Sequence, residues 1–461
     1  MCSFIVTFID IIKIIDTVNK YMKSRGPDKT TVVQRNGFIF LHNLLHITGQ
    51  ATPQPFIHNN IVAIYNGEIY NYIELGKKYG KCYQSDGQCI IDTYLFYGEK
   101  FAEYLDGEFA LVLIDFDKQI AIVSTDLFRT KPLWWSINPK FTVATYESAL
   151  IAAGCVDRQN MSANKILIFD LSAPNTPLLR TYHIYQFDLK QFKTSYDDYH
   201  SAFDRAVKKR ATQTNTAVYI CLSSGYDSGA IMGSLEKQGI KYGSFSLKCE
   251  EILPILQERI QMSHGFVKNY HELSQFEYDA EKAYVSAECE PYTMLPPQTN
   301  KLLSSNRACM GLSYIHRLAR SQGFRVVLSG QGADEIISNY GRFGVVIEKK
   351  IWIQLFPANL STIFPWSDFW SGSQQNFLAK EELVAGIYGI EARYPFLDKE
   401  VVQEFLWLTP ELKNQYYKAP LHTYLTKNHI PFKPNHKAGF AADKNLVNES
   451  NKEIKRSKRI T

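Results

Sequence analysis

This chain of 461 residues is 45% apolar and 21% charged. That composition excludes a largely disordered protein, because enough apolar surface is available to form packed cores. At roughly 150 residues per domain, the length predicts two or three domains. The net charge of +5 is the difference between 51 basic and 46 acidic residues, and the stretch from Lys452 to the end contributes +4 of it. The rest of the chain is nearly neutral, which argues against a nucleic-acid-binding groove.

The sequence also argues against membrane and secreted proteins. It contains no run of about 18 uncharged apolar residues, so no transmembrane helix is expected. The eight cysteines form no C-x-x-C pair, which fits the reducing cytoplasm. The apolar start, residues 1–18, has no basic leader and carries Asp10 and Lys13, so it predicts a strand followed by a helix rather than a signal peptide. Cys2 is then expected to stay near the mature N-terminus.

The first half of the chain is dense in short β-strand signals. Runs rich in β-branched and aromatic residues, separated by polar residues, glycine or proline, predict strands at residues 37–41, 60–65, 110–114 and 120–123. A helical stretch is predicted near residues 90–104. This pattern favours stacked, mostly antiparallel sheets.

The second half alternates strands with helices. Residues 170–188 predict a loose connection, and a domain boundary is expected near residue 190. Helices are predicted at residues 197–210 and 309–321, and strands at 217–222, 242–247 and 326–328. Strand, loop and helix in this order predict a parallel α/β sheet.

Cys2 is a candidate nucleophile. Methionine aminopeptidase removes Met1 when a small residue such as cysteine follows, and Cys2 would then carry a free α-amino group with a pKa near 7.7–8.0. That amine lies beside the thiol and can act as its general base. The alternative is an ordinary cysteine on an edge strand.

Three further motifs favour the nucleophile. They are residues 24–28 (Ser-Arg-Gly-Pro-Asp), 66–71 (Asn-Gly-Glu-Ile-Tyr-Asn) and 85–86 (Ser-Asp), and they occur in this order. With Cys2, they resemble the class II glutamine amidotransferases, which are N-terminal-nucleophile glutaminases. The resemblance implies that Cys2 attacks the glutamine amide and that Asn66 and Gly67 form the oxyanion hole. It also implies that glutamine is held by Leu45, Ile47, Asn66, Gly67, Glu68 and Asp86.

One residue departs from that family pattern. Relatives usually place an arginine, which holds the α-carboxylate of glutamine, where this chain has Leu44. A lost charge-assisted hydrogen bond costs about 1.5–3 kcal/mol. Glutamine affinity is therefore expected to fall roughly 10- to 100-fold, unless another basic group such as Arg35 substitutes.

The segment Leu222-Ser-Ser-Gly-Tyr-Asp-Ser228 predicts a phosphate-binding loop, because small residues between a strand and a helix let backbone N–H groups approach an anion. The chain contains no G-x-x-x-x-G-K-[ST] sequence, so this is not a Walker loop. Taken alone, the segment favours an ordinary turn.

Further motifs follow in order. The loop resembles the S-G-G-x-D-S pyrophosphate loop of the ATP pyrophosphatase fold, with Ser224 in place of the first glycine. Residues 328–335 (Leu-Ser-Gly-Gln-Gly-Ala-Asp-Glu), residues 389–398 (Gly-Ile-Glu-Ala-Arg-Tyr-Pro-Phe-Leu-Asp) and Lys418 come next. Together with the first half, this order resembles the glutamine-dependent asparagine synthetases over nearly the whole chain.

That resemblance implies a role for each motif residue. Asp227 and Asp334 hold Mg²⁺ on the phosphates, and Lys418 balances charge during the chemistry. The implied ATP and pyrophosphate ligands are Leu222, Ser223, Ser224, Gly225, Asp227, Ser228, Leu247, Ser329 and Gly330. Gln331 stands where a carboxylate is more usual; it can hydrogen-bond but cannot accept a proton. We therefore expect amide formation to persist and selectivity for aspartate to be in question.

The sequence is thus interpreted as an asparagine synthase (glutamine-hydrolysing)-like carbon–nitrogen ligase of the cytoplasm. Residues 1–190 are predicted to be the glutaminase, an α+β N-terminal-nucleophile sandwich (αββα). Residues 191–445 are predicted to be an α/β parallel-sheet ATP pyrophosphatase (adenine nucleotide alpha hydrolase-like) domain, and residues 446–461 a basic, disordered tail. ATP and Mg²⁺ are the expected cofactors, and glutamine and aspartate the substrates. The expected products include AMP and pyrophosphate, with ammonia passing through the interior.

Alternatives stay open at this point. The same chemistry could act on another carboxylate, such as a sugar acid of a surface polysaccharide or a peptide. A ring-forming ligase like the β-lactam synthetases lacks the nucleophilic cysteine, so Cys2 counts against it. A binding protein with lost catalysis is disfavoured because the motif residues are retained together. Relatives are often dimers, so a homodimer is an open possibility, and no nucleic-acid or membrane partner is expected.

Overall fold

The computed structural model describes residues 1–248, 251–294, 302–338 and 356–436. The chain divides into two compact units. The first comprises residues 1–186, 213–215 and 386–391, and the second comprises the remainder. No helix in the described ranges is long and apolar enough to cross a membrane. The predicted tail, residues 446–461, lies outside the described residues.

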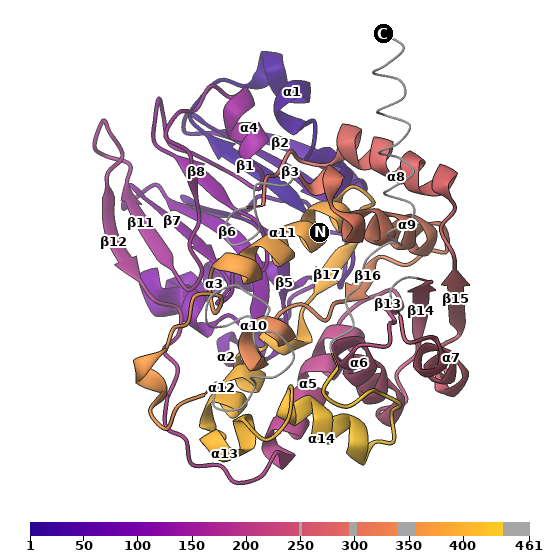
Figure 1. Ribbon diagram of the computed structural model, residues 1–461. Helices are drawn as coiled ribbons and strands as arrows, with labels where there is room; N and C mark the ends of the chain where they lie inside the picture. Colours follow the sequence, from indigo (N-terminus) through magenta and orange to yellow (C-terminus); the bar gives the residue numbers. More distant parts are fainter. Residues whose placement is uncertain (249–250, 295–301, 339–355, 437–461) are drawn as a thin grey trace. The chain divides into compact units, whose positions relative to one another are not determined.

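The first unit is built on two antiparallel six-stranded sheets (Figure 1). The first sheet, in the order β10-β8-β9-β1-β3-β2, consists of β1 (Ser3–Thr7), β2 (Lys29–Arg35), β3 (Phe38–Leu44), β8 (Trp134–Ser136), β9 (Thr142–Ala144) and β10 (Gln159–Asn160). The second, in the order β12-β11-β7-β6-β5-β4, consists of β4 (Phe56–His58), β5 (Ile61–Ile69), β6 (Gly107–Asp115), β7 (Ile120–Thr125), β11 (Ile166–Asp170) and β12 (Leu178–Tyr182).

Helices cover the outer faces of these sheets. They are α1 (Ile15–Asn19), α2 (Tyr72–Tyr79), α3 (Cys89–Tyr97) and α4 (Glu147–Ala152), with the short 3₁₀ helices η1 (Ile12–Ile14), η2 (Lys23–Arg25), η3 (Asp86–Gln88) and η4 (Gly98–Tyr104). Figure 1 shows α1 and α4 beside the first sheet and α2 and α3 beside the second. This arrangement confirms the αββα sandwich expected from the sequence.

The alternation of side chains along the strands creates two cores. Phe4, Phe40 and Ile64 belong to the core between the two sheets, whereas Ala63 and Tyr65 face the core on the helical side of the second sheet. Successive side chains of a strand point to opposite faces, so Asn66 and Glu68 of β5 face the space between the sheets. Cys2, two residues before Phe4, faces the same space.

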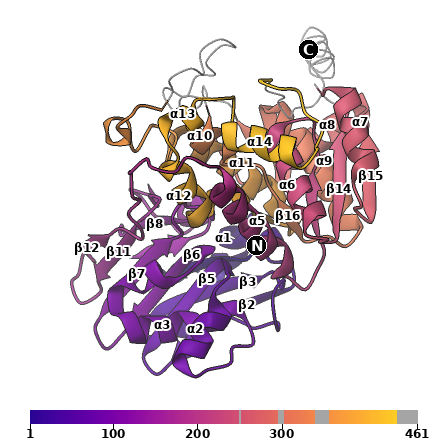
Figure 2. The same ribbon diagram turned by 90° about the horizontal axis from the view of Figure 1, so that it is seen from below.

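The second unit contains a five-stranded sheet, seen from another side in Figure 2. Its order is β15-β14-β13-β16-β17, formed by β13 (Val218–Cys221), β14 (Tyr242–Leu247), β15 (Val267–His271), β16 (Val326–Leu328) and β17 (Glu391–Arg393). β13 pairs in parallel with both β14 and β16. The chain order therefore reverses at β13 and β16, and ligands of such sheets bind at the carboxyl ends of the strands at this point.

Helices pack on both faces of this sheet. They are α5 (Asp197–Thr212), α6 (Tyr226–Lys237), α7 (Leu253–Met262), α8 (Gln275–Glu288), α9 (Arg307–Ser321), α10 (Ala333–Ile337), α11 (Gly372–Gly386), α12 (Lys399–Trp407), α13 (Pro410–Lys413) and α14 (Ala419–Lys427), with 3₁₀ helices η5 (Leu303–Ser305), η7 (Leu360–Thr362) and η8 (Pro395–Leu397). Figure 1 shows α8 and α9 on one face and α6 and α14 on the other.

The predicted elements compare closely with those observed. The strands predicted in the first half are confirmed as β3, β5, β6 and β7, and the strands and helices predicted in the second half are confirmed as β13, β14, β16, α5 and α9. Residues 170–188 were expected to be a loose connection, and this is wrong in part. Residues 178–182 form the edge strand β12, which pairs only with β11 and is largely exposed, so it carries no burial pattern that sequence could reveal.

Candidate active sites

Cys2 lies at the start of β1, and its side chain is 8% exposed. The backbone N–H of Leu45 donates a hydrogen bond to the Cys2 Sγ at 3.4 Å. Burial nevertheless raises the pKa of the Cys2 thiol to about 11, because a thiolate loses its hydration there. With Met1 in place, the thiol is therefore protonated at neutral pH and needs a base.

The amino end of the chain is itself buried. The Met1 amino nitrogen lies 3.9 Å from Glu391 Oε2, and burial lowers the pKa of this amine to about 5. The guanidinium of Arg25 donates from Nε to the Cys2 carbonyl at 3.1 Å. These contacts hold the start of β1 within the sandwich, so removal of Met1 would place the amine of Cys2 in the same interior.

Asn66 and Gly67 lie on β5. Asn66 is fully buried, and neither its side-chain oxygen nor its nitrogen has a hydrogen-bond partner in the described part of the chain. Buried amides without partners are rare and call for a ligand or water. Gly67 has a φ of 140°, and a Cβ there would lie 2.0 Å from the Glu108 carbonyl oxygen of β6. Only glycine therefore permits this approach of the two strands.

Two carboxylates of the first unit, Glu68 and Asp86, are also buried. Glu68 Oε2 accepts a hydrogen bond from Thr48 Oγ1 at 2.8 Å, and Asp86 Oδ2 accepts one from the Ile69 N–H at 2.9 Å. Burial raises the pKa of Asp86 to about 6. Leu45 and Ile47 are buried in the segment that follows β3. All the residues that the resemblance assigns to glutamine thus lie within the first unit.

Arg35 does not occupy the place of the missing arginine. Leu44, which stands at that position, pairs with Lys29 at one end of β2, whereas Arg35 pairs with Phe38 at the other end. The Arg35 Nη2 donates instead to the Asn59 carbonyl at 2.5 Å. Arg35, named above as one basic group that could substitute for the arginine, is therefore excluded from that role, because six residues of extended strand separate the two positions.

In the second unit, the loop after β13 is held by its own hydroxyl groups. Ser228 Oγ accepts a hydrogen bond from the Ser223 N–H at 3.1 Å and contacts Ser223 Oγ at 2.8 Å. The Gly225 N–H donates to Ser223 Oγ at 3.2 Å. Gly225 precedes α6, so the free N–H groups of a helix start face the loop. This geometry suits an anion.

Ser224, the residue in place of the usual glycine, contacts Glu251. The Ser224 N–H donates to Glu251 Oε2 at 2.6 Å, and its hydroxyl bonds the same oxygen. From the other side, Arg259 Nη1 donates to the carbonyls of Ser223 and Gly225, both at 2.6 Å. Arg259 is fully buried and thereby fixes the loop conformation.

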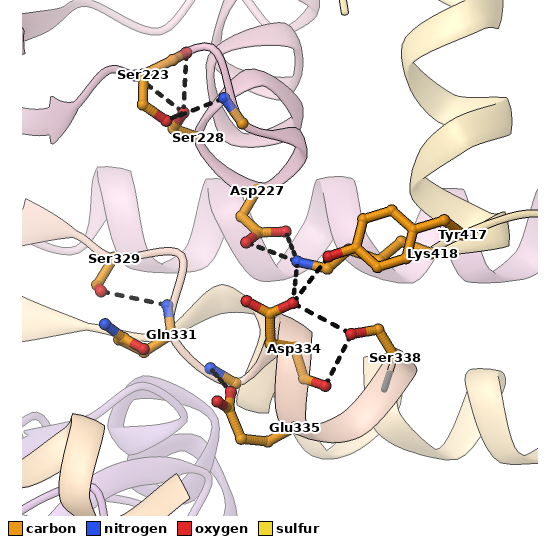
Figure 3. A network of polar contacts seen from close by, with 12 residues as sticks. Ser223, Asp227, Ser228, Ser329, Gln331, Asp334, Glu335, Ser338, Tyr417 and Lys418 are labelled. Atoms are coloured by element: carbon orange, nitrogen blue, oxygen red, sulfur yellow. Dashed lines mark hydrogen bonds and ion pairs between the residues drawn. The ribbon is translucent and has the colours of Figure 1, made fainter. Parts of the chain in front are cut away.

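Asp227, Asp334 and Lys418 form an ion-pair cluster (Figure 3). Lys418 Nζ lies 2.6 Å and 2.8 Å from the two oxygens of Asp227 and 2.9 Å from Asp334 Oδ1. Asp334 also accepts a hydrogen bond from the Tyr417 hydroxyl at 3.1 Å. The two carboxylates hold the pKa of Lys418 well above its usual value despite complete burial, so the cation persists.

Each member of this cluster is positioned by a different loop. Asp227 begins α6, and Asp334 begins α10 after β16, so the two acids follow neighbouring parallel strands. Lys418 precedes α14 with a φ of 48°, a left-handed conformation that non-glycine residues rarely adopt. It is 3% exposed, so it is not the solvated lysine that its place near a helix start would otherwise indicate.

The acids suit a magnesium ion. Mg²⁺ is usually held by one or two carboxylates together with substrate phosphates, and Asp227 and Asp334 supply two that already converge on one cation. Within the described residues, no group of three or more His, Cys, Asp or Glu side chains could hold a metal by itself. A metal at this point would therefore need oxygen ligands from a bound nucleotide.

The residues expected to contact the nucleotide lie at the same edge of the sheet. Leu222 and Leu247 are buried at the ends of β13 and β14, and the Leu222 N–H donates to the Phe245 carbonyl at 2.9 Å. Ser329 and Gly330 follow β16. A Cβ at Gly330 would lie 2.8 Å from the Asp227 Cβ, so a larger residue there would push the two loops apart.

Gln331 has a buried acid as its neighbour. Its Nε2 donates to Glu381 Oε1 of α11 at 3.2 Å. Glu381 is 5% exposed, and burial raises its pKa. The sequence analysis missed Glu381 because Lys380-Glu381-Glu382 looks like a solvated charged run. All three side chains are buried, and no signal in the sequence reveals it.

Comparison with known proteins decides the family. Residues 1–189 match the model of the glutamine amidotransferase domain, and residues 198–383 match that of asparagine synthase. The chain belongs to the glutamine-dependent asparagine synthetase family. A provisionally named glutamine-hydrolysing asparagine synthetase 1 of Methanocaldococcus jannaschii is 28% identical over 81% of this chain and 69% of its own length. Asparagine synthetase 2 of Arabidopsis thaliana is 25% identical over 86% of this chain and 68% of its own.

A more distant likeness is to a solved structure. Glutamine phosphoribosylpyrophosphate amidotransferase from B. subtilis is 15% identical over 53% of this chain and 65% of that one, with a TM-score of 0.33. This likeness is too weak to carry an argument. The family assignment therefore rests on the two domain matches and on the synthetase relatives.

Proposed function

We propose that this member of the asparagine synthetase family transfers ammonia from glutamine to an ATP-activated carboxylate, in the simplest case the side chain of aspartate. The observation that carries the proposal is the cluster of Asp227, Asp334 and Lys418 at the strand-order reversal of the parallel sheet. A buried cation shared by two acids suits a site at which phosphate charge is handled. The relatives' names support asparagine as the product.

The first half-reaction is hydrolysis of glutamine at Cys2. After removal of Met1, the α-amine of Cys2 takes the thiol proton, and the sulfur attacks the amide carbon. The C–N bond breaks, the proton leaves with ammonia, and water then cleaves the thioester to give glutamate. Asn66 Nδ2, which has no partner in the described residues, and the Gly67 N–H would stabilise the oxyanion.

The α-ammonium group of glutamine would be held by acids. Glu68 on β5 and Asp86 at the start of η3 are both buried, so their charges are only weakly screened. Leu45 and Ile47 would contact the aliphatic part of the substrate. These roles are transferred from the family motif, and the burial of each residue supports them.

The second half-reaction is activation of the carboxylate. A carboxylate oxygen of aspartate attacks the α-phosphorus of ATP, pyrophosphate leaves, and an aspartyl-adenylate forms. Ser223, Gly225 and Ser228 would hold the departing pyrophosphate, and Lys418 would balance its charge. Asp227 and Asp334 would hold Mg²⁺, which neutralises phosphate charge when bound. Ammonia then attacks the acyl carbon, AMP leaves, and one proton is released.

Glu381 would supply the acid that position 331 lacks. An amide cannot accept the proton that ammonia loses, but Gln331 bonds directly to Glu381. The raised pKa of Glu381 brings this carboxylate closer to the range in which a general base is effective. Gln331 would therefore orient the nucleophile, and Glu381, held beside it by this hydrogen bond, would accept the proton directly from the attacking nitrogen.

The direct test is pyrophosphate release from Mg-ATP and L-aspartate, with glutamine or ammonium as the nitrogen donor. Release accompanied by asparagine establishes the reaction. No release with aspartate, but release with another carboxylate such as a sugar acid or a peptide, would transfer the assignment to that acceptor. If none of the carboxylates tested leads to pyrophosphate release, the proposal is contradicted.

Another acceptor is the second candidate. The observation that favours it is Gln331, because this residue lies in the loop where aspartate-specific relatives carry an acid. The cytoplasmic location expected from the sequence stays a prediction, and the homodimer stays an open possibility.

A further inference from the structure

The glutaminase site has two acids for the ammonium group of glutamine and lacks the usual cation for its carboxylate. Glutamine is a zwitterion, so burying its carboxylate beside Glu68 and Asp86 without a cation would be costly. Leu44 cannot provide one. The strand register shows which other basic residue can reach the α-carboxylate of glutamine.

The registers of β1, β2 and β3 place three side chains in a row. Ser3 pairs with Asn43, so Cys2, one residue earlier, lies opposite Leu44. On the other side of β3, Leu44 pairs with Lys29. Directly opposite residues of antiparallel strands point to the same face, with Cβ atoms about 4.5–5.5 Å apart. The row across the sheet is therefore Cys2, Leu44 and Lys29.

This row lies on the face that carries the chemistry. Phe4 and Phe40 lie an even number of residues from Cys2 and Leu44 and therefore share their face; both belong to the core between the sheets, and Val33 of β2 packs against that core. By the same alternation, Lys29 points to that face at the open end of the strand. The spacing of neighbouring strands is about 4.8 Å, so Lys29 lies roughly 10 Å from Cys2. A glutamine carboxylate lies four carbon–carbon bonds from the amide carbon, which suits a long lysine between the two.

Three other cations of the first unit are either engaged elsewhere or too distant. Arg25 donates to the Cys2 carbonyl and to the Tyr146 hydroxyl, and Lys131 lies 3.6 Å from Glu108 Oε2 with no exposed surface. Arg35 is at the far end of β2. Lys29 is exposed, and its side chain has no hydrogen bond or ion pair with any residue that the structure describes.

We infer that Lys29 is the cation that binds the α-carboxylate of glutamine. From the neighbouring strand β2, it takes the role of the arginine that relatives usually place where this chain has Leu44. The inference rests on the proposed glutaminase function of Cys2. Lys29 is a specificity-determining residue: it touches the substrate but takes no part in bond breaking. Its loss should therefore weaken binding and leave turnover at saturation intact.

The experiment compares glutamine with glutaminamide, in which an amide masks the α-carboxylate. For Lys29→Ala, we expect the KM for glutamine to rise about 10- to 100-fold, with kcat changed less than about twofold. The KM for glutaminamide should stay unchanged, since no charge is left to recognise. Lys29→Ala/Leu44→Arg should restore the glutamine KM. Lys140→Ala is the matched control, because Lys140 is an exposed lysine beyond the opposite end of the same sheet.

A binding measurement separates this inference from the proposed function. Calorimetric titration of glutamine into Cys2→Ala and Cys2→Ala/Lys29→Ala needs no catalysis. A Kd for glutamine that is about 10- to 100-fold higher in the double variant supports the role of Lys29 in binding. This holds even if the wild-type protein hydrolyses no glutamine, because absence of hydrolysis would refute only the proposed glutaminase activity. Equal affinities, no binding by either variant, or equal KM changes with both amides would overturn the role of Lys29.

Discussion

By the family pattern, each of the two proposed active sites lacks one charged side chain, and each has a side chain of the right charge on a neighbouring element. In the glutaminase, Leu44 replaces a cation, and Lys29 lies opposite it on β2. In the synthetase, Gln331 replaces an acid, and Glu381 of α11 bonds to it. The two differ in burial: Lys29 is exposed, whereas Glu381 is 5% exposed.

That difference separates binding from chemistry. An exposed lysine on a flexible stem can bind a substrate group but cannot act as a base at neutral pH while it stays charged. A buried carboxylate with a raised pKa is positioned to take a proton. We therefore expect substitution of Lys29 to act on KM and substitution of Glu381 to act on kcat.

The largest effect is expected at Cys2. Cys2→Ala should lower glutamine-dependent synthesis by about 10⁴-fold or more, because no other described thiol can form the thioester there. Ammonium-dependent synthesis should be unchanged, as measured by asparagine formation with each donor. Cys82→Ala, which removes an exposed thiol of the same unit, is the control. Equal loss with both donors would contradict the division of labour between the two sites.

The next largest effect is expected at Lys418. Lys418→Ala should slow pyrophosphate release about 10³-fold with either donor, because it removes the cation and leaves Asp227 and Asp334 as unpaired like charges. Lys427→Ala, in the last turn of the helix that Lys418 precedes, should have little effect because Lys427 is exposed. Pyrophosphate release that persists in Lys418→Ala would remove this lysine from the mechanism.

Glu381→Gln tests the replacement acid. We expect amide formation to fall about 10²-fold, while exchange of pyrophosphate into ATP in the presence of aspartate continues, since adenylation needs no proton acceptor. The double variant Gln331→Glu/Glu381→Gln returns an acid to the usual position and should recover most of the rate. If both variants lose exchange and synthesis together, Glu381 has only a structural role.

The smallest effect is a pH dependence of the glutaminase. Burial raises the pKa of Asp86 to about 6, so this acid is charged above pH 6 and neutral below it. A neutral acid cannot balance the ammonium group of glutamine. The kcat/KM for glutamine should therefore fall about tenfold for each pH unit below 6, whereas the kcat/KM for ammonium should not follow that limb. Asp86→Asn should lower kcat/KM and abolish this limb, and an unchanged profile would show that another group titrates.

Much of the fold could be predicted because its signals are local. The runs that became β3, β5, β6 and β13 combine β-branched residues with clear punctuation, and the parallel sheet follows from the alternation of strand and helix. The motif residues Asp227, Asp334 and Lys418 were also found from their order, although they are far apart in sequence. The edge strand β12 was missed because an exposed strand shows no buried face.

The replacement groups could not be predicted in the same way. Nothing in Lys380-Glu381-Glu382 indicates that a charged run is buried, and Arg35 was a reasonable substitute for the missing arginine until the register placed it at the wrong end of β2. Both depend on which residue faces which across two elements, and a shift of one residue would turn each side chain to the other face.

The amino-acid sequence by itself indicated the family, the two proposed kinds of chemistry and the main motif residues, because these depend on residue types in a particular order along the chain. Tertiary structure alone decided that Lys418 joins two acids, that Asn66 is buried without a partner and that Lys29 and Glu381 stand beside the altered positions. The physical reason is that electrostatic effects depend on distance and burial, and both are set by the packing of segments that are remote in sequence.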